Sequence, residues 1–317
     1  MGAQVLDKIA LRHGFETQSH NRCMTSSTPA SLRICAVVVT YNPHPLFMEN
    51  IAAVGAQVDE VVIVDNGSSS ETEAYLKELE SRPGCRVLRN PRNLGIAAAL
   101  NRGVRFAESL GSDWIATFDQ DSRVSDGYVA EMLETYRNSP QADRVAIVTP
   151  TYIDRASGVR GSLLRSRSGE LLTTITSGSL MPASVLTELG DFDESLYMDY
   201  VDIDYCLRAR RQGMRILESP ATLYHSLGRT TYHRILGISF GATNHSAKRR
   251  YYITRNRLRV LWRYGADWPW AWREVKAVLA DAVKIVLVED NKWKKFQAML
   301  AGSIDALAGK MGKQVDL

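Results

Sequence analysis

The feature that most constrains the fold is a series of short apolar runs that alternate with helix-like segments. Residues 34–40 read Ile-Cys-Ala-Val-Val-Val-Thr, and the run from Val61 to Val64 repeats this composition before Asp65. Uninterrupted apolar runs of this kind are typical of strands buried on both faces, as in parallel sheets. Between them, a helix-like stretch from about Leu46 to Ala56 suits a right-handed βαβ crossover. The sequence therefore predicts an α/β fold with a mostly parallel sheet flanked by helices.

The alternation continues to Pro150 and weakens beyond it. The second expected helix begins at Ser68, because Ser68 and Glu71 have the spacing of a capping box. The remaining elements are expected as strands at 86–88, 114–118, 145–148 and 173–181, and as helices near 95–110, 128–136, 183–189 and 199–212. From Ser246 onward, apolar residues recur every three or four positions, which predicts a C-terminal helical extension.

The composition is that of a globular protein. Its 317 residues are 45% hydrophobic, enough to bury the core of one large domain or two small ones. The net charge of +4 does not by itself mark a nucleic-acid binder. The four cysteines have no paired spacing, so we expect reduced core residues of a cytoplasmic protein. Residues 1–31 are polar and lack an apolar signal core, which predicts a disordered leader.

A basic, tryptophan-rich segment lies near the C-terminus. Seven cations and no acid lie between Lys248 and Arg263, and five of the six tryptophans lie between Trp262 and Trp293. Such segments bind anionic membrane surfaces, so the sequence predicts peripheral contact with the cytoplasmic face of the inner membrane. Because every long apolar stretch is broken by charges, we expect no membrane-spanning helix.

Two carboxylates, Asp119 and Asp121, flank Gln120 at the end of the apolar strand 114–118. A residue at the end of a buried strand points into the crevice where open α/β sheets bind ligands. Two such carboxylates form a hard oxygen site suited to Mg²⁺ or Mn²⁺, a cation that usually carries a substrate's phosphates. Taken alone, however, such triplets are more often solvated turn or helix-cap residues.

Polar residues also follow the first two strands. Thr40, Tyr41 and Asn42 close the first strand, and Asp65 closes the second. Asp65 could accept a hydrogen bond from a nucleobase N–H or a ribose hydroxyl, or it could only cap the turn. There is no G-x-G-x-x-G and no Walker motif, so neither a dinucleotide site nor a Walker-type triphosphate site is indicated.

The segment from Asn93 to Gly103 is rich in small residues and predicts a helix whose start approaches a ligand closely. Around Asn93 and Gly95, free backbone N–H groups would face an anion, and Arg102 is a candidate partner for a diphosphate or carboxylate. Close packing of an alanine-rich helix against the sheet explains the same composition.

A second acidic cluster contains Asp199, Asp202 and Asp204 near the start of an expected helix. Asp202 and Asp204 lie about 200° apart on a helix and cannot face the same cleft. Since Arg208 is placed to pair with Asp204, Asp202 remains as a candidate general base, unless all three acids only favour the helix N-terminus. His225, which follows an apolar strand, is a candidate third metal ligand or a structural histidine.

Together these motifs resemble those of inverting glycosyltransferases of family 2, with the GT-A fold, and in particular of bacterial rhamnosyltransferases. The matching segments are Val38–Pro43, Val64–Ser68, Asn93–Gly95, Phe118–Ser122, Phe192–Glu194, Tyr197–Asp204, Leu207–Arg210, Arg249–Tyr252 and Arg255–Asn256. They span roughly residues 33 to 300, and their order is far more specific than any one motif.

The resemblance implies a nucleotide-diphosphate sugar donor, with Thr40, Tyr41 and Asp65 near the nucleoside. It implies Asp119 and Asp121 at the ribose and metal. It further implies Asp202 as the catalytic base and His225 as a metal or diphosphate contact. Within the family, the Asp-Gln-Asp-Ser and Arg-Arg-Tyr-Tyr segments point to dTDP-L-rhamnose, with a glycan or lipid-linked acceptor. One departure is Val201, where many relatives carry glutamate beside the base.

The resemblance also divides the chain. It implies a GT-A (Rossmann-like) catalytic domain over residues 32–245, with a nucleotide-binding half to about 125 and an acceptor half from about 126. Residues 246–317 form the basic helical region. Three rivals stay open: transfer from a UDP or GDP sugar, a nucleotidyltransferase, and a non-catalytic module binding membrane or nucleic acid. The nucleotidyltransferase would be expected to carry a glycine-rich, basic loop where Tyr41, Asn42 and Pro43 stand.

Overall fold

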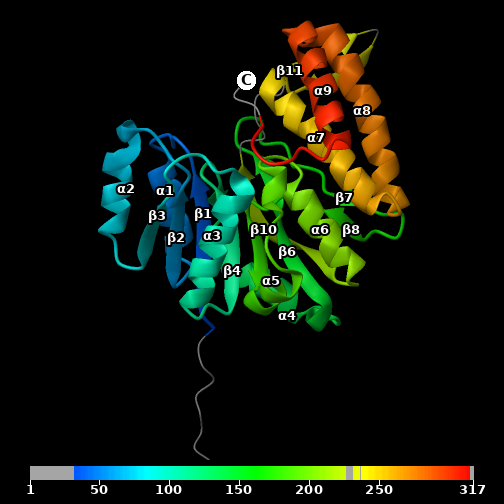
Figure 1. Cartoon of the computed structure of the whole chain (residues 1–317). Helices are drawn as coiled ribbons and strands as arrows, with labels where there is room; N and C mark the ends of the chain where they lie inside the picture. Colours follow the sequence, from blue (N-terminus) through cyan, green and yellow to red (C-terminus); the bar gives the residue numbers. More distant parts are fainter. Residues whose placement is uncertain (1–31, 226–230, 236, 315–317) are drawn as a thin grey trace, which may run out of the picture. The chain divides into compact units, whose positions relative to one another are not determined.

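The computed structural model describes residues 32–225, 231–235 and 237–314 (Figure 1). The predicted leader, residues 1–31, lies outside the described residues. The described residues belong to one compact unit in which strands and helices alternate. The α/β fold predicted from the sequence is confirmed.

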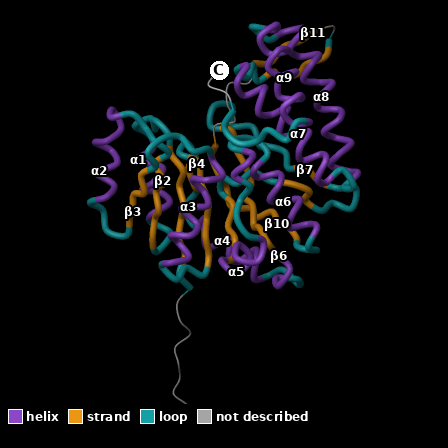
Figure 2. Tube along the Cα trace, in the orientation of Figure 1, coloured by secondary structure: helices purple, strands orange, loops and turns teal. Residues whose placement is uncertain are grey.

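The central sheet, whose strands are orange in Figure 2, has the strand order β3-β2-β1-β4-β9-β6-β10-β5. They are β1 (Ile34–Thr40), β2 (Glu60–Asp65), β3 (Cys85–Arg89), β4 (Trp114–Asp119), β5 (Arg123–Val124), β6 (Val145–Asp154), β9 (Ser179–Pro182) and β10 (Arg215–His225). The strands β1 to β4 are parallel, as are β6 and β10. Only β9 and β5 pair antiparallel to their neighbours in this sheet. The sheet is therefore mostly parallel, as predicted.

Helices cover both faces of this sheet. They are α1 (Phe47–Gly55), α2 (Glu73–Glu80), α3 (Ile96–Ser109), α4 (Tyr128–Arg137), α5 (Ala183–Leu189) and α6 (Val201–Arg211). Side chains of β1 alternate between two cores, because successive residues of a strand point to opposite faces. Cys35, Val37 and Val39 pack with α3, α5 and α6, whereas Ala36 and Val38 pack with α1, α2 and α4.

The C-terminal region is helical, as expected, and consists of α7 (Ala247–Tyr264), α8 (Trp268–Val288) and α9 (Lys292–Leu307). The hydroxyl of Ser246 caps α7 by accepting the N–H of Arg249 at 3.2 Å. A hairpin of β11 (Thr231–Ile235) and β12 (Ile238–Ala242) precedes it and was not predicted. Among the described residues, no helix combines the length and apolar composition needed to cross a bilayer.

Two expected elements are wrong in detail. Ser68 does not start a capped helix, because its hydroxyl bonds to Asp65 and accepts the N–H of Asn42, and the helix α2 follows a short turn instead. The expected strand 173–181 is two strands. β8 (Leu171–Thr173) pairs with β7 (Leu164–Arg165), and β9 joins the central sheet. Between β8 and β9, Gly178 turns the chain with a φ of +80°.

Three of the seven cations of the basic segment point inward. Arg250, Arg255 and Arg257 in α7 are at most 7% exposed. Arg250 pairs with Glu289 at 2.6 Å, and Arg257 pairs with Glu274 at 3.1 Å. These acids come from α8 and the residue after it, so the sequence of the segment itself did not reveal them. The buried arginines of residues 248–263 are therefore not part of the basic surface expected from the sequence.

Candidate active site

Four strands deliver their carboxyl ends to one edge of the sheet. In the parallel pairs, Thr40 lies opposite Asp65 and Val39 lies opposite Asp119. Strand β10 runs in the same direction, because β9 is antiparallel to both β4 and β6. His225, the last residue of β10, thus reaches the edge where open α/β sheets bind their ligands.

A cleft of about 1030 Å³ opens at this edge. Eight of the eleven predicted site residues line it: Thr40, Tyr41, Asn93, Gly95, Asp119, Asp121, Asp202 and His225. Lys248, Arg249 and Lys313 also line it and were not predicted as site residues. The volume is at the upper end of the range for ligand sites and suits a nucleotide with an attached sugar.

Asp119, Asp121 and His225 come together in the cleft. One ligand atom from each lies within 4.8 Å of the others. Nδ1 of His225 is 3.3 Å from Oδ1 of Asp121 and 3.0 Å from the hydroxyl of Ser122. Oδ1 of Asp121 is shielded from solvent beside His225, and such an oxygen is costly for a carboxylate unless positive charge lies next to it. Two carboxylates and an imidazole therefore fit Mg²⁺ or Mn²⁺ at this position.

The protonation of this cluster reflects its crowded negative charge. Burial raises the pKa of Asp119; the charge of His225 opposes this, and that of Asp121 adds to it. Burial alone would lower the pKa of His225, but its hydrogen bond to Asp121 and the two carboxylates outweigh burial and raise it. Without a cation, the site thus favours a proton on His225, and a metal ligated through that nitrogen must displace it.

Asp202 lies in the first turn of α6, directly after residues with left-handed backbone conformations. The φ of Tyr200, the residue before the helix, is +67°. Oδ1 of Asp202 accepts the N–H of Ile203 at 2.8 Å. Burial raises the pKa of Asp202 to about 7, with smaller additions from the carboxylates of Asp199 and Asp119. A carboxyl group with this pKa can accept a proton from a hydroxyl group at neutral pH.

Asp204 faces away from the cleft, as the helical spacing predicted. It is fully buried and pairs with Arg208 at 3.3 Å, the partner expected from the sequence. It also pairs at 2.5 Å with Arg263 of α7, which the sequence did not indicate. Asp204 therefore joins α6 to the C-terminal helices, while Asp202 faces the cleft.

Gln120, between the two carboxylates, organises the neighbouring strand end. Its Oε1 accepts the hydroxyl of Thr40 at 2.9 Å and the N–H of Tyr41 at 2.8 Å. The sequence analysis did not assign it a role, although it sits inside the Asp-Gln-Asp motif. The bonds hold Tyr41 in the cleft with 46% of its surface exposed.

The start of α3 depends on a close backbone approach at Gly95. Its φ is +93°, and an added Cβ would lie 2.5 Å from the carbonyl oxygen of Tyr197. The side chain of Asn66 donates to Asn93 and to the carbonyl of Gly95, which fixes this turn. The N–H of Ile96 donates to Tyr197 at 2.8 Å. The sequence predicted that N–H groups here face an anion, but the chain itself uses this one.

Three predicted donor-binding residues do not line the cleft. Asn42 accepts the N–H of Ser69 at 2.8 Å through its side chain, and Asp65 accepts the N–H of Ser68 at 3.2 Å. Arg102 donates to the carbonyl of Arg89 at 2.7 Å. Their side chains hold turns and strand ends together, so the proposal below does not use them as donor ligands.

The loop before Asp202 is held by α7. Asn256 donates to the carbonyls of Leu196, Met198 and Asp199 at 2.7 to 3.0 Å. Its neighbour Arg255 donates to Leu196 at 3.1 Å. Both side chains are fully buried. These hydrogen bonds connect a motif on a C-terminal helix with the sheet edge, because they hold the loop that precedes Asp202.

We expect Asn256→Ala to lower the free energy of unfolding by about 2–4 kcal/mol, because it leaves buried carbonyls without donors. The activity should fall as well, since the loop loses its support. Chemical denaturation measures the first effect. Asn138→Ala, at an exposed asparagine after α4, is the control and should change the stability by less than about 0.5 kcal/mol. An unchanged free energy of unfolding in Asn256→Ala would contradict the supporting role of Asn256 in the loop before Asp202.

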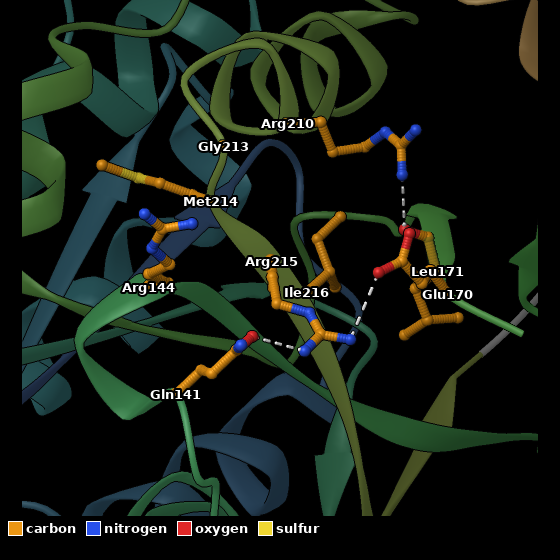
Figure 3. A pocket seen from close by; sticks show the side chains of 9 residues that line it. All are labelled: Gln141, Arg144, Glu170, Leu171, Arg210, Gly213, Met214, Arg215 and Ile216. Carbon is orange, nitrogen blue, oxygen red and sulfur yellow. Dashed lines mark hydrogen bonds and ion pairs between the residues drawn. The ribbon is translucent and has the colours of Figure 1, made fainter. Parts of the chain in front are cut away.

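A second cavity, of about 430 Å³, lies at the other end of β10, where the strand begins (Figure 3). Two of its three arginines are engaged: Arg215 pairs with Glu170 at 3.3 Å, and Arg210 donates to the carbonyl of Leu171 and to Asp267. It lies at the amino end of the strand, away from the edge that binds ligands in such sheets. We therefore place the active site in the larger cleft.

Comparisons with known proteins relate most of the chain to glycosyltransferases. Residues 35–182 match the model of the family described as "Glycosyl transferase family 2". The chain is 29% identical, over 88% of its length and 97% of the relative, to dTDP-rhamnosyl transferase RfbF of Shigella flexneri. It is 28% identical to galactofuranosyltransferase GlfT1 of Mycolicibacterium smegmatis, over 64% of this chain and 74% of that one.

Two solved structures share the fold. GalNAc-T7 with UDP, GalNAc and Mn²⁺ aligns with a TM-score of 0.54 and 16% identity, over 88% of this chain and 57% of that one. Staphylococcus aureus TarS 1-349 with UDP-GlcNAc aligns with a TM-score of 0.51 and 14% identity, over 88% and 73%. At this identity they support the GT-A-like fold alone. Residues 35–182 thus match glycosyltransferase family 2, and over most of its length the chain is similar to a bacterial dTDP-rhamnosyl transferase.

Proposed function

We propose that this enzyme transfers L-rhamnose from dTDP-L-rhamnose to a hydroxyl of a glycan or lipid-linked acceptor, in the synthesis of a bacterial cell-surface polysaccharide or glycolipid. The donor is inferred from the dTDP-rhamnosyl transferase of Shigella flexneri, which the chain matches over nearly the whole of that protein. The observation that carries the proposal is that Asp202 lines the same cleft as Asp119, Asp121 and His225.

The nucleoside end of the donor is assigned to the ends of β1 and β4. The exposed ring of Tyr41 offers a face on which the base can stack. Thr40, Asn93 and Gly95 line the same cleft. Asp119 is the ribose contact at the border with the metal site.

We assign Mg²⁺ or Mn²⁺ to Asp119, Asp121 and His225. The solvent-shielded oxygen of Asp121 and the mixed carboxylate and imidazole ligands support this assignment. When bound, the cation would supply positive charge beside the departing diphosphate. Lys248 and Lys313 line the cleft and add positive charge that favours the same anion.

The chemistry assigned to the protein is a single displacement. Asp202 accepts the proton of the acceptor hydroxyl while that oxygen bonds to the anomeric carbon. The bond between this carbon and the diphosphate breaks on the opposite face, and its electron pair leaves with dTDP. Because attack and departure occur on opposite faces, the configuration at the anomeric carbon inverts.

We place the reaction in the cytoplasm, at the inner membrane. Cys35, Cys85 and Cys206 are buried and free, which agrees with a reducing compartment. Burial also raises the pKa of Cys35 to about 12, so this thiol is not reactive at neutral pH.

A donor panel tests the proposal against another nucleotide sugar. With Mn²⁺ present, dTDP and dTDP-L-rhamnose should raise the melting temperature more than UDP or GDP sugars. At 100 times the Kd, a ligand stabilises the folded state by about 2.7 kcal/mol, a shift of several degrees. Equal or larger shifts with UDP or GDP would contradict the rhamnose donor. No shift with any nucleotide, together with salt-dependent binding of polynucleotide, would favour the nucleic-acid module instead.

A further inference from the structure

The helix α8 has two faces of different character. At about 100° per residue, its exposed apolar side chains fall within one arc of roughly 120°. They are Trp272, Val275, Leu279, Val283, Val286 and Leu287, and each is between 45% and 66% exposed. On the opposite side, Trp270 and Ile285 are completely buried. The apolar arc is therefore an outer face without a partner in the described part of the chain.

The helix α9 repeats this arrangement. Trp293, Leu300, Ile304 and Leu307 fall on one side of the helix, and each is between 55% and 77% exposed. Both stripes have a tryptophan near the start of their helix. Soluble proteins seldom leave such exposed apolar stripes on two consecutive helices.

The charges on these helices are separated by sign. The acids of α8 turn inward: Glu274 pairs with Arg257 at 3.1 Å, and Asp281 pairs with Arg250 at 3.3 Å. After α8, Glu289 is also buried and pairs with Lys295 at 2.9 Å. The side chains left exposed include the cations Arg273, Lys276, Lys292 and Lys294, whereas Asp290 is the exposed acid of this described region. The outer surface is thus both apolar and basic.

We propose that the outer faces of α8 and α9 dock the enzyme on an anionic lipid bilayer, lying on the surface rather than crossing it. Charge complementarity selects this occupant. A second copy related by a two-fold axis would place cations against cations, because each face contacts itself. Anionic head groups match the lysines, while the acyl boundary accepts the apolar stripe. Lys276 lies 5.2 Å from the ring centre of Trp272, so charge and tryptophan sit together as they do at membrane interfaces.

This inference rests on the proposed membrane location and names the surface responsible. It narrows the sequence-based expectation, which assigned the contact to the basic, tryptophan-rich segment from Lys248 to Trp293, to the outer faces of α8 and α9. The arginines of α7 instead neutralise the acids of α8, and this pairing leaves the outer side of α8 without negative charge.

Flotation of the full chain with vesicles tests the proposal. We expect binding to vesicles of phosphatidylglycerol and phosphatidylcholine, and little binding to phosphatidylcholine alone. Val283→Glu, on the stripe, should lower the partition coefficient at least about tenfold. Val159→Glu is the matched control, since Val159 is 56% exposed and Val283 54%, and it should change nothing. Lys276→Gln should lower the partition coefficient about fivefold, the share of one cation near an anionic surface.

Equal binding to neutral and anionic vesicles, or no effect of Val283→Glu, would overturn the proposal. So would a stable dimer in light scattering that Val283→Glu dissociates, because the face would then belong to a second copy. The shift of melting temperature caused by dTDP is measured on the same variants. Failure of flotation with a normal dTDP shift rejects the docking surface alone, whereas loss of the dTDP shift in every protein rejects the donor assignment.

Discussion

Asp202→Asn is expected to lower kcat by about 100-fold to 10,000-fold, the usual contribution of a general base. The donor KM should change little, because Asn keeps the shape of the side chain and the cleft retains its other lining. Initial rates at varied donor concentration, with the released dTDP as the signal, measure both parameters. The effect is large because Asp202 is the half-buried carboxylate placed to receive the acceptor proton.

The matched control is Asp126→Asn, at an exposed carboxylate in the turn before α4, which should leave the rate unchanged. Asp202→Asn with normal turnover and weaker donor binding would contradict the role of the base. In the wild-type enzyme, kcat should fall as the pH drops below about 7, since protonation of Asp202 removes the base.

The carboxyl group of Asp202 should also affect the free energy of unfolding. It should destabilise the folded state at high pH, whereas an acid with a lowered pKa stabilises it there. The pKa of Asp202 is raised to about 7 in the folded state, against about 4 in the unfolded chain, so the folded state binds more protons between these values. Its contribution to stability is therefore lost as the pH rises from about 4 to 7. At pH 8, Asp202→Asn should increase the free energy of unfolding by about 1–2 kcal/mol, measured by denaturation at pH 8 and pH 5.

The second large effect is expected at the metal site. Asp121→Ala should lower the activity at least about 100-fold at micromolar Mn²⁺, because it removes one of three ligands in the cluster. Titration with Mn²⁺, followed by its electron paramagnetic resonance signal, should show weaker binding. In the wild-type protein, Mn²⁺ affinity should rise with pH, since the raised pKa of His225 makes a proton compete with the metal.

Asp126→Ala again serves as the control and should bind Mn²⁺ like the wild type. Full activity of the wild-type enzyme in EDTA would contradict a metal-assisted reaction. Normal Mn²⁺ affinity in Asp121→Ala, combined with lost activity, would instead assign this carboxylate to the substrate.

The elements near the N-terminus were predictable because each carries a complete local signal. The run 34–40 is apolar throughout, and a strand of this kind is stable only between two covered faces. The Asp-Gln-Asp motif could be placed at the carboxyl edge for the same reason. By contrast, the sequence predicted one strand over 173–181, because it did not show that Gly178 turns the chain between two sheets.

Partners that are distant in sequence were not predictable. The basic segment 248–263 resembles a membrane surface until Glu274, Asp281 and Glu289 are seen to neutralise it from the next helix and the residue after it. Likewise, Asn256 has no local signal for its contacts with the loop 196–199, which lies some sixty residues earlier.

The sequence by itself determined the α/β class, the strand ends that carry the acids, and the separation of Asp202 from Asp204, because these follow from local periodicity. Only the tertiary structure decided that Asp202 shares a cleft with Asp121 and His225, that Asn42, Asp65 and Arg102 hold turns instead, and that the exposed apolar surface lies on α8 and α9. These outcomes depend on which charged side chains and carbonyl groups, distant in the sequence, become partners in the folded chain. A buried group of this kind is costly unless its partner is present.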